Sequence, residues 1–241
     1  MVFEKYGFCL LPVGDNLLAI GGISNGDPLS SVEVFTTGEG WRLEAKLEMQ
    51  STKFYHCSVQ IESWLYTIGG QVDGKISASN IVEAFDTSLM STAHPIAWVK
   101  KANMIEKRFT HGCNIGVFGG QEGIFVAGGT NENYQNLASA EFYDPARNRW
   151  EAIGSLKTGP RVFFPMTILG ENSITVSGGE PGLLTSVDSW NGTSWVESNS
   201  LMVGSTFHFP FPFLISIFQV GRGYHAAVSI KTGKISCSGR R

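Results

Sequence analysis

Short runs of apolar residues, each ending in two adjacent glycines, recur along the chain. Such runs are typical of buried strands when glycine, asparagine or aspartate bounds them. The four runs are Leu17–Gly22, Leu65–Gly70, Ile124–Gly129 and Ile174–Gly179. Their first glycines lie at intervals of 48, 59 and 50 residues. Because self-similarity at a nearly fixed period marks a repeat architecture, this pattern predicts several copies of one β-sheet unit.

Three further features follow each pair of glycines in the same order. They are an acid within a second β-like run, a tryptophan, and a basic residue that begins the next copy. The acids are Glu33, Glu83, Glu141 and Asp188; the tryptophans are Trp41, Trp98, Trp150 and Trp195. The basic residues are Lys53, Arg108 and Arg161. Since a single small sheet cannot bury both of its faces, the copies are expected to pack on one another.

This order of diglycine, acid with an aromatic residue, tryptophan and arginine resembles the kelch repeat over essentially the whole chain. The resemblance implies an all-β fold, a kelch-type β-propeller in which each repeat forms one four-stranded blade. We expect one propeller domain over residues 1–241 with four complete blades and a partial fifth, so that the ring is incomplete or open. The expected repeats lie near 6–50, 53–105, 108–158, 161–202 and 220–241.

An apolar insert at 203–219 separates the fourth repeat from the partial fifth. Its uncharged stretch Phe209–Phe218 has two interpretations: a loop that grips a partner or a membrane surface, or a short unspliced intron. We favour the intron because an exposed apolar run is costly in water. The partial repeat keeps the family spacing, since Arg222 precedes Gly239 by 17 residues, as Arg161 precedes Gly178.

The composition is typical of a globular protein and limits the classes of partner that the protein can bind. Hydrophobic residues make up 42% and charged residues 16%, which excludes wholesale disorder. The net charge of −3 gives no basic surface for nucleic acid. No apolar run is long enough to cross a bilayer, and no signal peptide begins the sequence. We therefore expect a cytoplasmic protein that binds neither nucleic acid nor membrane.

The histidines could suggest a metal site, but their spacing favours a packing role. His56, His111 and His225 each lie three residues after a basic residue of the repeat, and Phe164 takes that place after Arg161. A position that accepts phenylalanine is expected in the core. The sequence also lacks G-x-S-x-G, H-E-x-x-H and C-x-x-C motifs. We therefore expect no enzyme activity, no metal or other cofactor, and no small-molecule substrate.

By resemblance to kelch propellers, the loops after each diglycine and around each basic residue form one face. Arginine, tyrosine and amide side chains together suit protein recognition. We expect this face to bind a peptide or loop of a partner protein. The expected contact residues are Asn25, Lys53, Tyr55, Gln71, Asp73, Arg108, Thr130, Asn131, Arg161, Phe163, Arg222 and Tyr224. For each basic residue, pairing with a repeat acid is the equally weighted alternative.

The resemblance implies a non-enzymatic protein–protein interaction module, such as a ubiquitin-ligase substrate adaptor or an actin-associated protein. Kelch adaptors carry an N-terminal BTB domain, whereas the first repeat here begins near Tyr6, which argues against an adaptor role for this chain alone. The alternative is a propeller-based enzyme similar to galactose oxidase. Its copper site needs a cysteine bonded to a tyrosine, a second tyrosine and two histidines. The repeat-equivalent placement of the histidines disfavours that alternative.

Overall fold

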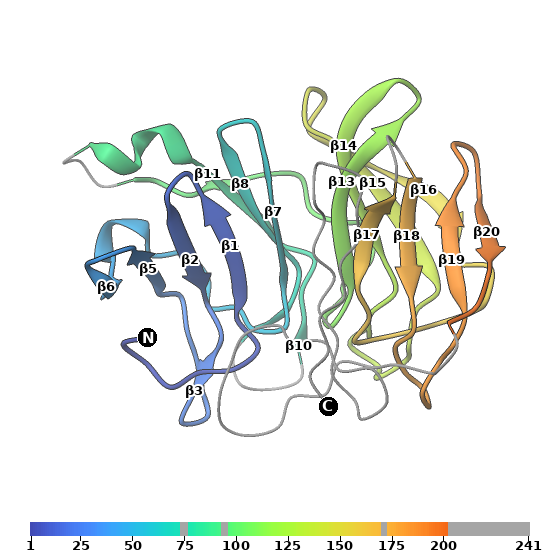
Figure 1. Ribbon diagram of the computed structural model, residues 1–241, viewed down its shortest axis with the longest axis horizontal. Coiled ribbons are helices and arrows are strands. Elements are labelled where there is room, and N and C mark those ends of the chain that lie inside the picture. Colours follow the sequence, from blue (N-terminus) through green and yellow to red (C-terminus); the bar gives the residue numbers. More distant parts are fainter. Residues whose placement is uncertain (73–76, 93–95, 170–172, 202–241) are drawn as a thin grey trace. The chain divides into compact units, whose positions relative to one another are not determined.

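The computed structural model describes residues 1–72, 77–92, 96–169 and 173–201. In these ranges the strands form four antiparallel sheets of four strands each, plus two two-stranded hairpins (Figure 1). The helical segments among them are the short 3₁₀ helices η1 (Ala45–Leu47) and η2 (Thr87–Ser91). None of the described helices is long and apolar enough to span a membrane. The predicted all-β architecture is confirmed, while the apolar insert and the partial fifth repeat lie outside the described residues.

Each diglycine copy supplies one sheet, and the four strands of each sheet pair in chain order. The first sheet consists of β1 (Cys9–Val13), β2 (Asn16–Ile20), β5 (Val32–Thr36) and β6 (Gly40–Leu43). The second consists of β7 (Cys57–Ile61), β8 (Trp64–Ile68), β11 (Val82–Asp86) and β12 (Val99–Lys100). The third consists of β13 (Gly112–Phe118), β14 (Gln121–Ala127), β15 (Ser139–Asp144) and β16 (Arg149–Ser155). The fourth consists of β17 (Met166–Leu169), β18 (Ser173–Ser177), β19 (Val187–Trp190) and β20 (Trp195–Ser198).

Two small hairpins follow the glycine pairs of the first two sheets. One joins β3 (Ile23–Ser24) to β4 (Asp27–Pro28), and the other joins β9 (Gln71–Val72) to β10 (Ser77–Ala78). In the first unit both hairpins lie at the end of the sheets opposite to η2 (Figure 1). The segments that follow the glycines therefore extend from one end of the sheets, as expected for loops that carry function.

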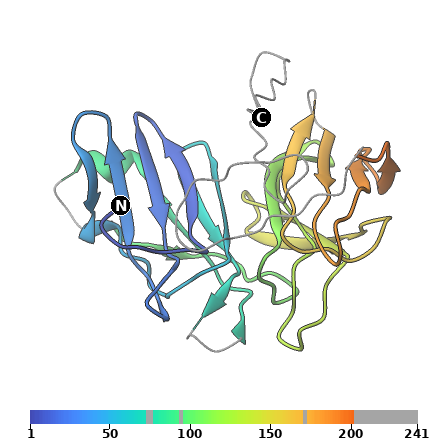
Figure 2. The same ribbon diagram turned by 60° about the horizontal axis from the view of Figure 1, so that its bottom comes forward.

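The chain divides into two compact units, each with its own hydrophobic core. Among the described residues, the first unit comprises those within 1–110, 130–135 and 147–150, and the second comprises those within 111–129, 136–146 and 151–201. In the core of the first unit, apolar side chains of the first two sheets meet, with the rings of Phe85 and Trp98 4.7 Å apart. Figure 2 shows the separate twisted sheets within each unit.

The core of the second unit is aromatic and lies between the third and fourth sheets. Phe125 of β14 contacts Phe142 of β15 with ring centroids 5.1 Å apart, and it contacts Trp190 of β19 at 5.7 Å. These rings meet edge to face, which favours aromatic pairs beyond the burial of their area. Trp195 is buried, as its repeat position predicts, and Trp190 is buried as well.

Both glycines of every pair have positive φ. Gly128 has φ of 63°, and a Cβ atom built on it would lie 2.6 Å from the carbonyl oxygen of Arg161. The next residue, Gly129, donates its N–H to that same oxygen at 2.9 Å. A side chain at 128 would therefore break the junction between the third and fourth sheets, which explains why glycine is needed here.

Candidate functional site

The acids of the repeat form buried ion pairs with basic residues that lie near the start of each copy. In all three pairs both side chains are fully buried. The pairs are Lys5–Glu33 at 3.0 Å, Lys53–Glu83 at 3.4 Å and Arg161–Asp188 at 2.9 Å. A buried pair costs desolvation, which good geometry and further hydrogen bonds must offset. Lys53 and Arg161 thus pair with repeat acids, as the alternative interpretation of the basic residues expects.

The pair Arg161–Asp188 shows how many backbone groups one such ion pair binds. The Nη1 atom of Arg161 donates to the carbonyl oxygens of Gly178 at 2.9 Å and Ser186 at 3.1 Å. The Asp188 carboxylate accepts hydrogen bonds from the backbone N–H groups of Lys157 and Thr158. The pair therefore joins the end of the third sheet to the diglycine turn of the fourth, and its role is structural.

Several residues expected on the docking surface have buried side chains. The side chains of Lys53, Arg108 and Arg161 are fully buried. Gln71 and Thr130 are buried too, at 5% and 8% exposure. A side chain without solvent exposure offers no surface to a partner, so these five residues belong to the scaffold. Asp73, Arg222 and Tyr224 lie outside the described residues.

The residue two positions after each basic residue adopts a left-handed backbone. These residues are Gly7, Tyr55, Thr110 and Phe163, with φ of 64°, 52°, 54° and 52°. In the first unit they form a hydrogen-bonded series, in which Tyr55 N donates to Gly7 O at 2.7 Å and Thr110 N donates to Tyr55 O at 3.0 Å. A bulky residue with positive φ is uncommon and costs energy that the surrounding structure must offset.

The Tyr55 ring is partly exposed and lies among other aromatic rings. Its centroid lies 6.4 Å from that of Tyr6 and 5.3 Å from that of Phe54. Burial raises the pKa of the Tyr55 hydroxyl, and the neighbouring Tyr6 adds to the increase. Tyr55 therefore stays a neutral hydrogen-bonding group at physiological pH. Phe163 has the same repeat position in the second unit and is also half-buried.

Single β-bridges attach the segment after each glycine pair to the aromatic segment after a basic residue. In the first unit the bridges are Tyr6 with Ile23, Phe54 with Gln71, and Phe109 with Thr130. Because these bridges are connected by the hydrogen-bonded series described above, the hairpin β3–β4, residues 53–55 and the loop 130–135 lie on one surface of the first unit. We call this surface of the first unit the docking face, represented by Tyr6, Asn25, Tyr55, Asn131 and Tyr134.

The loop 130–135 of the docking face is organised by Asn131. The Oδ1 atom of Asn131 accepts hydrogen bonds from the N–H groups of Asn133 and Gln135. This arrangement presents Tyr134, which has positive φ and is 61% exposed. Asn25, at the tip of the hairpin β3–β4, is exposed as well. The loop is therefore an ordered support for an exposed aromatic ring.

Sequence reasoning missed Lys5 and Tyr134. Lys5 precedes Gly21 by 16 residues, the same spacing as Lys53 to Gly69, so the signal was present but fell before the predicted start of the first repeat. The exposure of Tyr134 depends on the loop conformation that the hydrogen bonds of Asn131 stabilise. No pattern in the sequence predicts that conformation.

The buried polar groups beneath the docking face have strongly altered pKa values. Burial lowers the pKa of Lys53 to about 8, although Glu83 acts in the opposite direction. Burial, with Lys53 and Lys5 nearby, lowers the pKa of His56 to about 3. His56 is therefore neutral at physiological pH. The described residues contain no group of three or more His, Cys, Asp or Glu side chains that could hold a metal ion.

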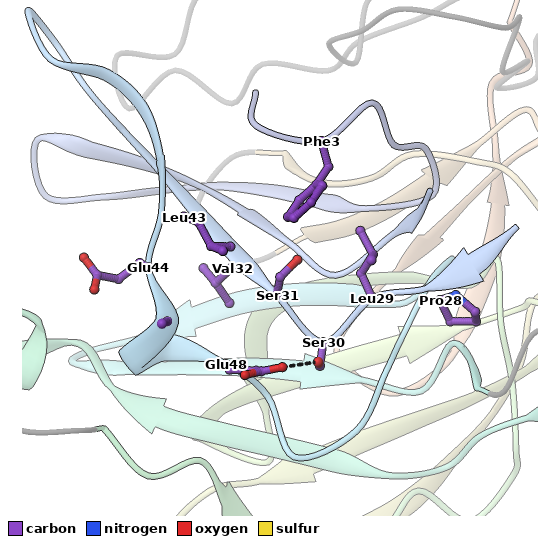
Figure 3. A pocket seen from close by; sticks show the side chains of 10 residues that line it. Phe3, Pro28, Leu29, Ser30, Ser31, Val32, Leu43, Glu44 and Glu48 are labelled. Carbon is purple, nitrogen blue, oxygen red and sulfur yellow. Dashed lines mark hydrogen bonds between the residues drawn. The ribbon is translucent and has the colours of Figure 1, made fainter. Parts of the chain in front are cut away.

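A separate cavity of about 260 Å³ opens on the first sheet (Figure 3). Its walls are apolar at Phe3, Leu29 and Leu43, and Ser30 donates to Glu48 Oε1 across its floor at 2.7 Å. None of the predicted contact residues lines it. The polar side chains of its lining are Ser30, Ser31, Glu44 and Glu48.

Comparison with known proteins finds kelch sequences. The family model described as the kelch motif matches residues 111–157. Beta-scruin of Limulus polyphemus is 27% identical over 151 residues, which cover 58% of this chain and 15% of that protein. Kelch-like protein 23 of Homo sapiens is 33% identical over 106 residues, covering 44% and 16%. The chain therefore spans about a sixth of the length of these relatives.

The fold has a counterpart among solved structures. The structure of YjhT superposes with a TM-score of 0.61 at 13% sequence identity, covering 83% of this chain and 66% of that one. Together with the four-stranded antiparallel sheets, this similarity confirms the predicted β-propeller fold. At this level of identity the likeness concerns the fold and leaves function open.

Proposed function

Because this chain is a kelch-repeat protein, we propose that it is a protein-interaction module whose docking face binds a peptide or loop of a partner protein. The observation that carries the proposal is the pair of tyrosines, Tyr55 and Tyr134, held in left-handed conformations by ordered hydrogen bonds. Tyrosine supplies large contact area and a hydrogen-bonding group, and it is enriched among residues that dominate binding energy.

Two properties of the docking face support binding. The buried ion pairs and the core fix the sheets, so the loops are presented by a scaffold that need not reorganise. Such preorganisation reduces the entropy lost on association. The exposed amide of Asn25 adds an adaptable donor and acceptor beside the aromatic rings.

We extend this proposal to the class of protein to which the chain belongs. We propose binding without catalysis, by a cytoplasmic protein that acts as a ubiquitin-ligase substrate adaptor or an actin-associated protein. Phe163 of the second unit, which has the conformation of Tyr55, is proposed to contribute in the same way. The similarity to scruins and kelch-like proteins supports the proposal of a protein partner.

A library of displayed natural peptide segments tests the docking face. Peptides selected on the wild-type chain are measured against Tyr134→Asn and Tyr55→Asn, because asparagine tolerates the left-handed backbone. We expect a loss of affinity of about tenfold or more, as for residues that dominate an interface. Leu89→Ala is the matched control, since Leu89 is 44% exposed on η2 at the opposite end of the sheets.

The control also defines failure of the proposal. Peptides that bind both tyrosine variants as well as wild type, or that lose affinity with Leu89→Ala, would place the interaction elsewhere. Circular dichroism of each variant should remain β-like, which separates a lost contact from a lost fold.

A further inference from the structure

The chain contains two Asn-Gly pairs, and the structure places them in contrasting environments. Asn25-Gly26 forms the tip of the hairpin β3–β4, and Asn191-Gly192 lies between β19 and β20. Both glycines have positive φ, and a Cβ atom on either would meet nothing within 4 Å. Both asparagines are exposed. The two pairs therefore differ chiefly in what holds the asparagine side chain.

The side chain of Asn191 is fixed by three hydrogen bonds. Its Oδ1 atom accepts from Thr193 N at 3.0 Å, from Thr193 Oγ1 at 3.0 Å and from Ser194 N at 2.9 Å. By contrast, the side chain of Asn25 and the N–H of Gly26 have no hydrogen-bond partner among the described residues. The carboxamide of Asn25 is thus free to rotate.

The hairpin that carries Asn25 is also easy to open. Strands β3 and β4 have two residues each, and their register joins Ile23 to Pro28 and Ser24 to Asp27. The N–H and carbonyl groups of Ile23 bond to Tyr6, so the pair Ile23–Pro28 contributes no hydrogen bond between β3 and β4. Few hydrogen bonds therefore oppose the backbone rotation that brings Gly26 N toward Asn25 Cγ.

We propose that Asn25 is a site of spontaneous deamidation and isomerisation, from which Asn191 is protected. The backbone nitrogen of Gly26 loses its proton to solvent base and attacks Asn25 Cγ, forming an N–C bond. The side-chain nitrogen takes up a proton and leaves as ammonia, which closes a succinimide ring. Water then opens either ring carbonyl, giving aspartate or isoaspartate at position 25.

The product changes both charge and backbone at the docking face. A carboxylate appears two residues from Asp27, and isoaspartate adds a methylene group to a two-residue turn. Such a turn depends on an Asn-Gly pair with positive φ to match the twist of its strands. The modified hairpin is expected to lose its register, and any effect on partner binding rests on the proposed function, whereas the chemistry itself does not.

Peptide mass spectrometry of the intact chain, incubated in mildly alkaline buffer, measures both rates in one molecule. We expect Asn25 to deamidate at least about tenfold faster than Asn191, a ratio equivalent to roughly one hydrogen bond to be broken before attack. In urea the two rates should converge, because the unfolded chain removes the three bonds of Asn191.

A conservative variant tests the cause of the protection. Thr193→Val removes the hydroxyl bond to Asn191 and should accelerate deamidation there while the rate at Asn25 stays unchanged. A native rate ratio near one, or the same ratio in urea and in the native protein, would overturn the proposal.

Discussion

Lys53 and Glu83 carry opposite charges in a region without solvent, with their charged atoms 3.4 Å apart. The Nζ atom of Lys53 also donates to Thr67 Oγ1 at 3.3 Å and to the carbonyl oxygen of Ile81 at 3.3 Å. Glu83 in turn accepts from the hydroxyl of Ser51. These extra bonds offset part of the desolvation cost, and they make each partner depend on the other.

Replacing Lys53 with methionine leaves the Glu83 carboxylate buried and unpaired. We expect Lys53→Met to lower the free energy of unfolding by about 3–5 kcal/mol. The double variant Lys53→Met/Glu83→Gln should recover a large part of that loss, because no net charge then remains. Urea unfolding of the three proteins measures both effects; a double variant as unstable as the single one would refute the coupling.

His56 presents the opposite case, a buried polar group without compensation. Neither of its ring nitrogens has a hydrogen-bond partner among the described residues. The equivalent position in the fourth sheet is Phe164, which is 5% exposed. The apolar ring is thus the better fit, since an unsatisfied buried donor costs about 1–3 kcal/mol.

We therefore expect His56→Phe to stabilise the protein, and more so in acid. The pKa of His56 is about 3 in the folded chain and 6.5 in its ordinary state. Because the unfolded chain binds the proton first, the wild type loses stability as the pH falls from 6.5 toward 3. Urea unfolding at pH 7 and at a pH near 5 should show a smaller acid loss for His56→Phe. The reverse swap Phe164→His should enlarge it, and equal acid losses would contradict this explanation.

For single residues, the position within the repeat could be predicted from the sequence, but the solvent exposure of the side chain could not. The spacing of Arg161 from Gly178 identified a repeat residue. Arginine usually lies at the surface, but this one is buried, where its Nη atoms bind Asp188 and two carbonyl oxygens. Tyr55 shows the converse, because it lies two residues after the buried Lys53 and is nevertheless half-exposed.

At the level of strands, one tryptophan position shows how the sheets depend on their neighbours. Trp98 donates its indole N–H to Leu47 O at 2.7 Å, and Trp150 donates to Ala102 O at 2.8 Å. Trp98 and Trp150 are buried, at 2% and 7% exposure. Trp41 of the first sheet stacks on Phe35 but remains half-buried. The equivalent tryptophans therefore differ in burial and in hydrogen bonding from one sheet to the next.

We expect Trp150→Ala to cost about 3–5 kcal/mol of stability through the cavity it leaves and the lost indole bond. Trp41→Ala, at the equivalent position, should cost clearly less because its ring is already partly in water. Thermal or urea unfolding of both variants checks this order. Equal costs would show that the two positions are packed alike.

The strands and their order along the chain could be predicted because the same residue pattern recurs in four repeats. The Leu65–Gly70 run became β8, and the acid-bearing run around Glu83 became β11. The hairpin β3–β4 was not separated from its loop in the prediction. It consists of two residues on each side, too few for the alternation of apolar and polar residues to identify a strand.

Across the whole molecule, charge is buried where sheets meet and aromatic rings are exposed where loops extend. Lys5, Lys53 and Arg161 fix the sheets, whereas Tyr55 and Tyr134 remain accessible at their ends. The repeat pattern predicted the β-propeller scaffold, and it left open whether the basic residues bind a partner or pair with the repeat acids.

Hydrogen–deuterium exchange tests where a partner binds most directly. A peptide selected by display is added to the wild-type chain, and amide exchange is compared with that of the free protein. We predict added protection in the hairpin β3–β4, in residues 53–55 and in the loop 130–135, with none in η2. Protection confined to η2, or to the cavity beside Phe3 and Leu43, would contradict the assignment of the docking face.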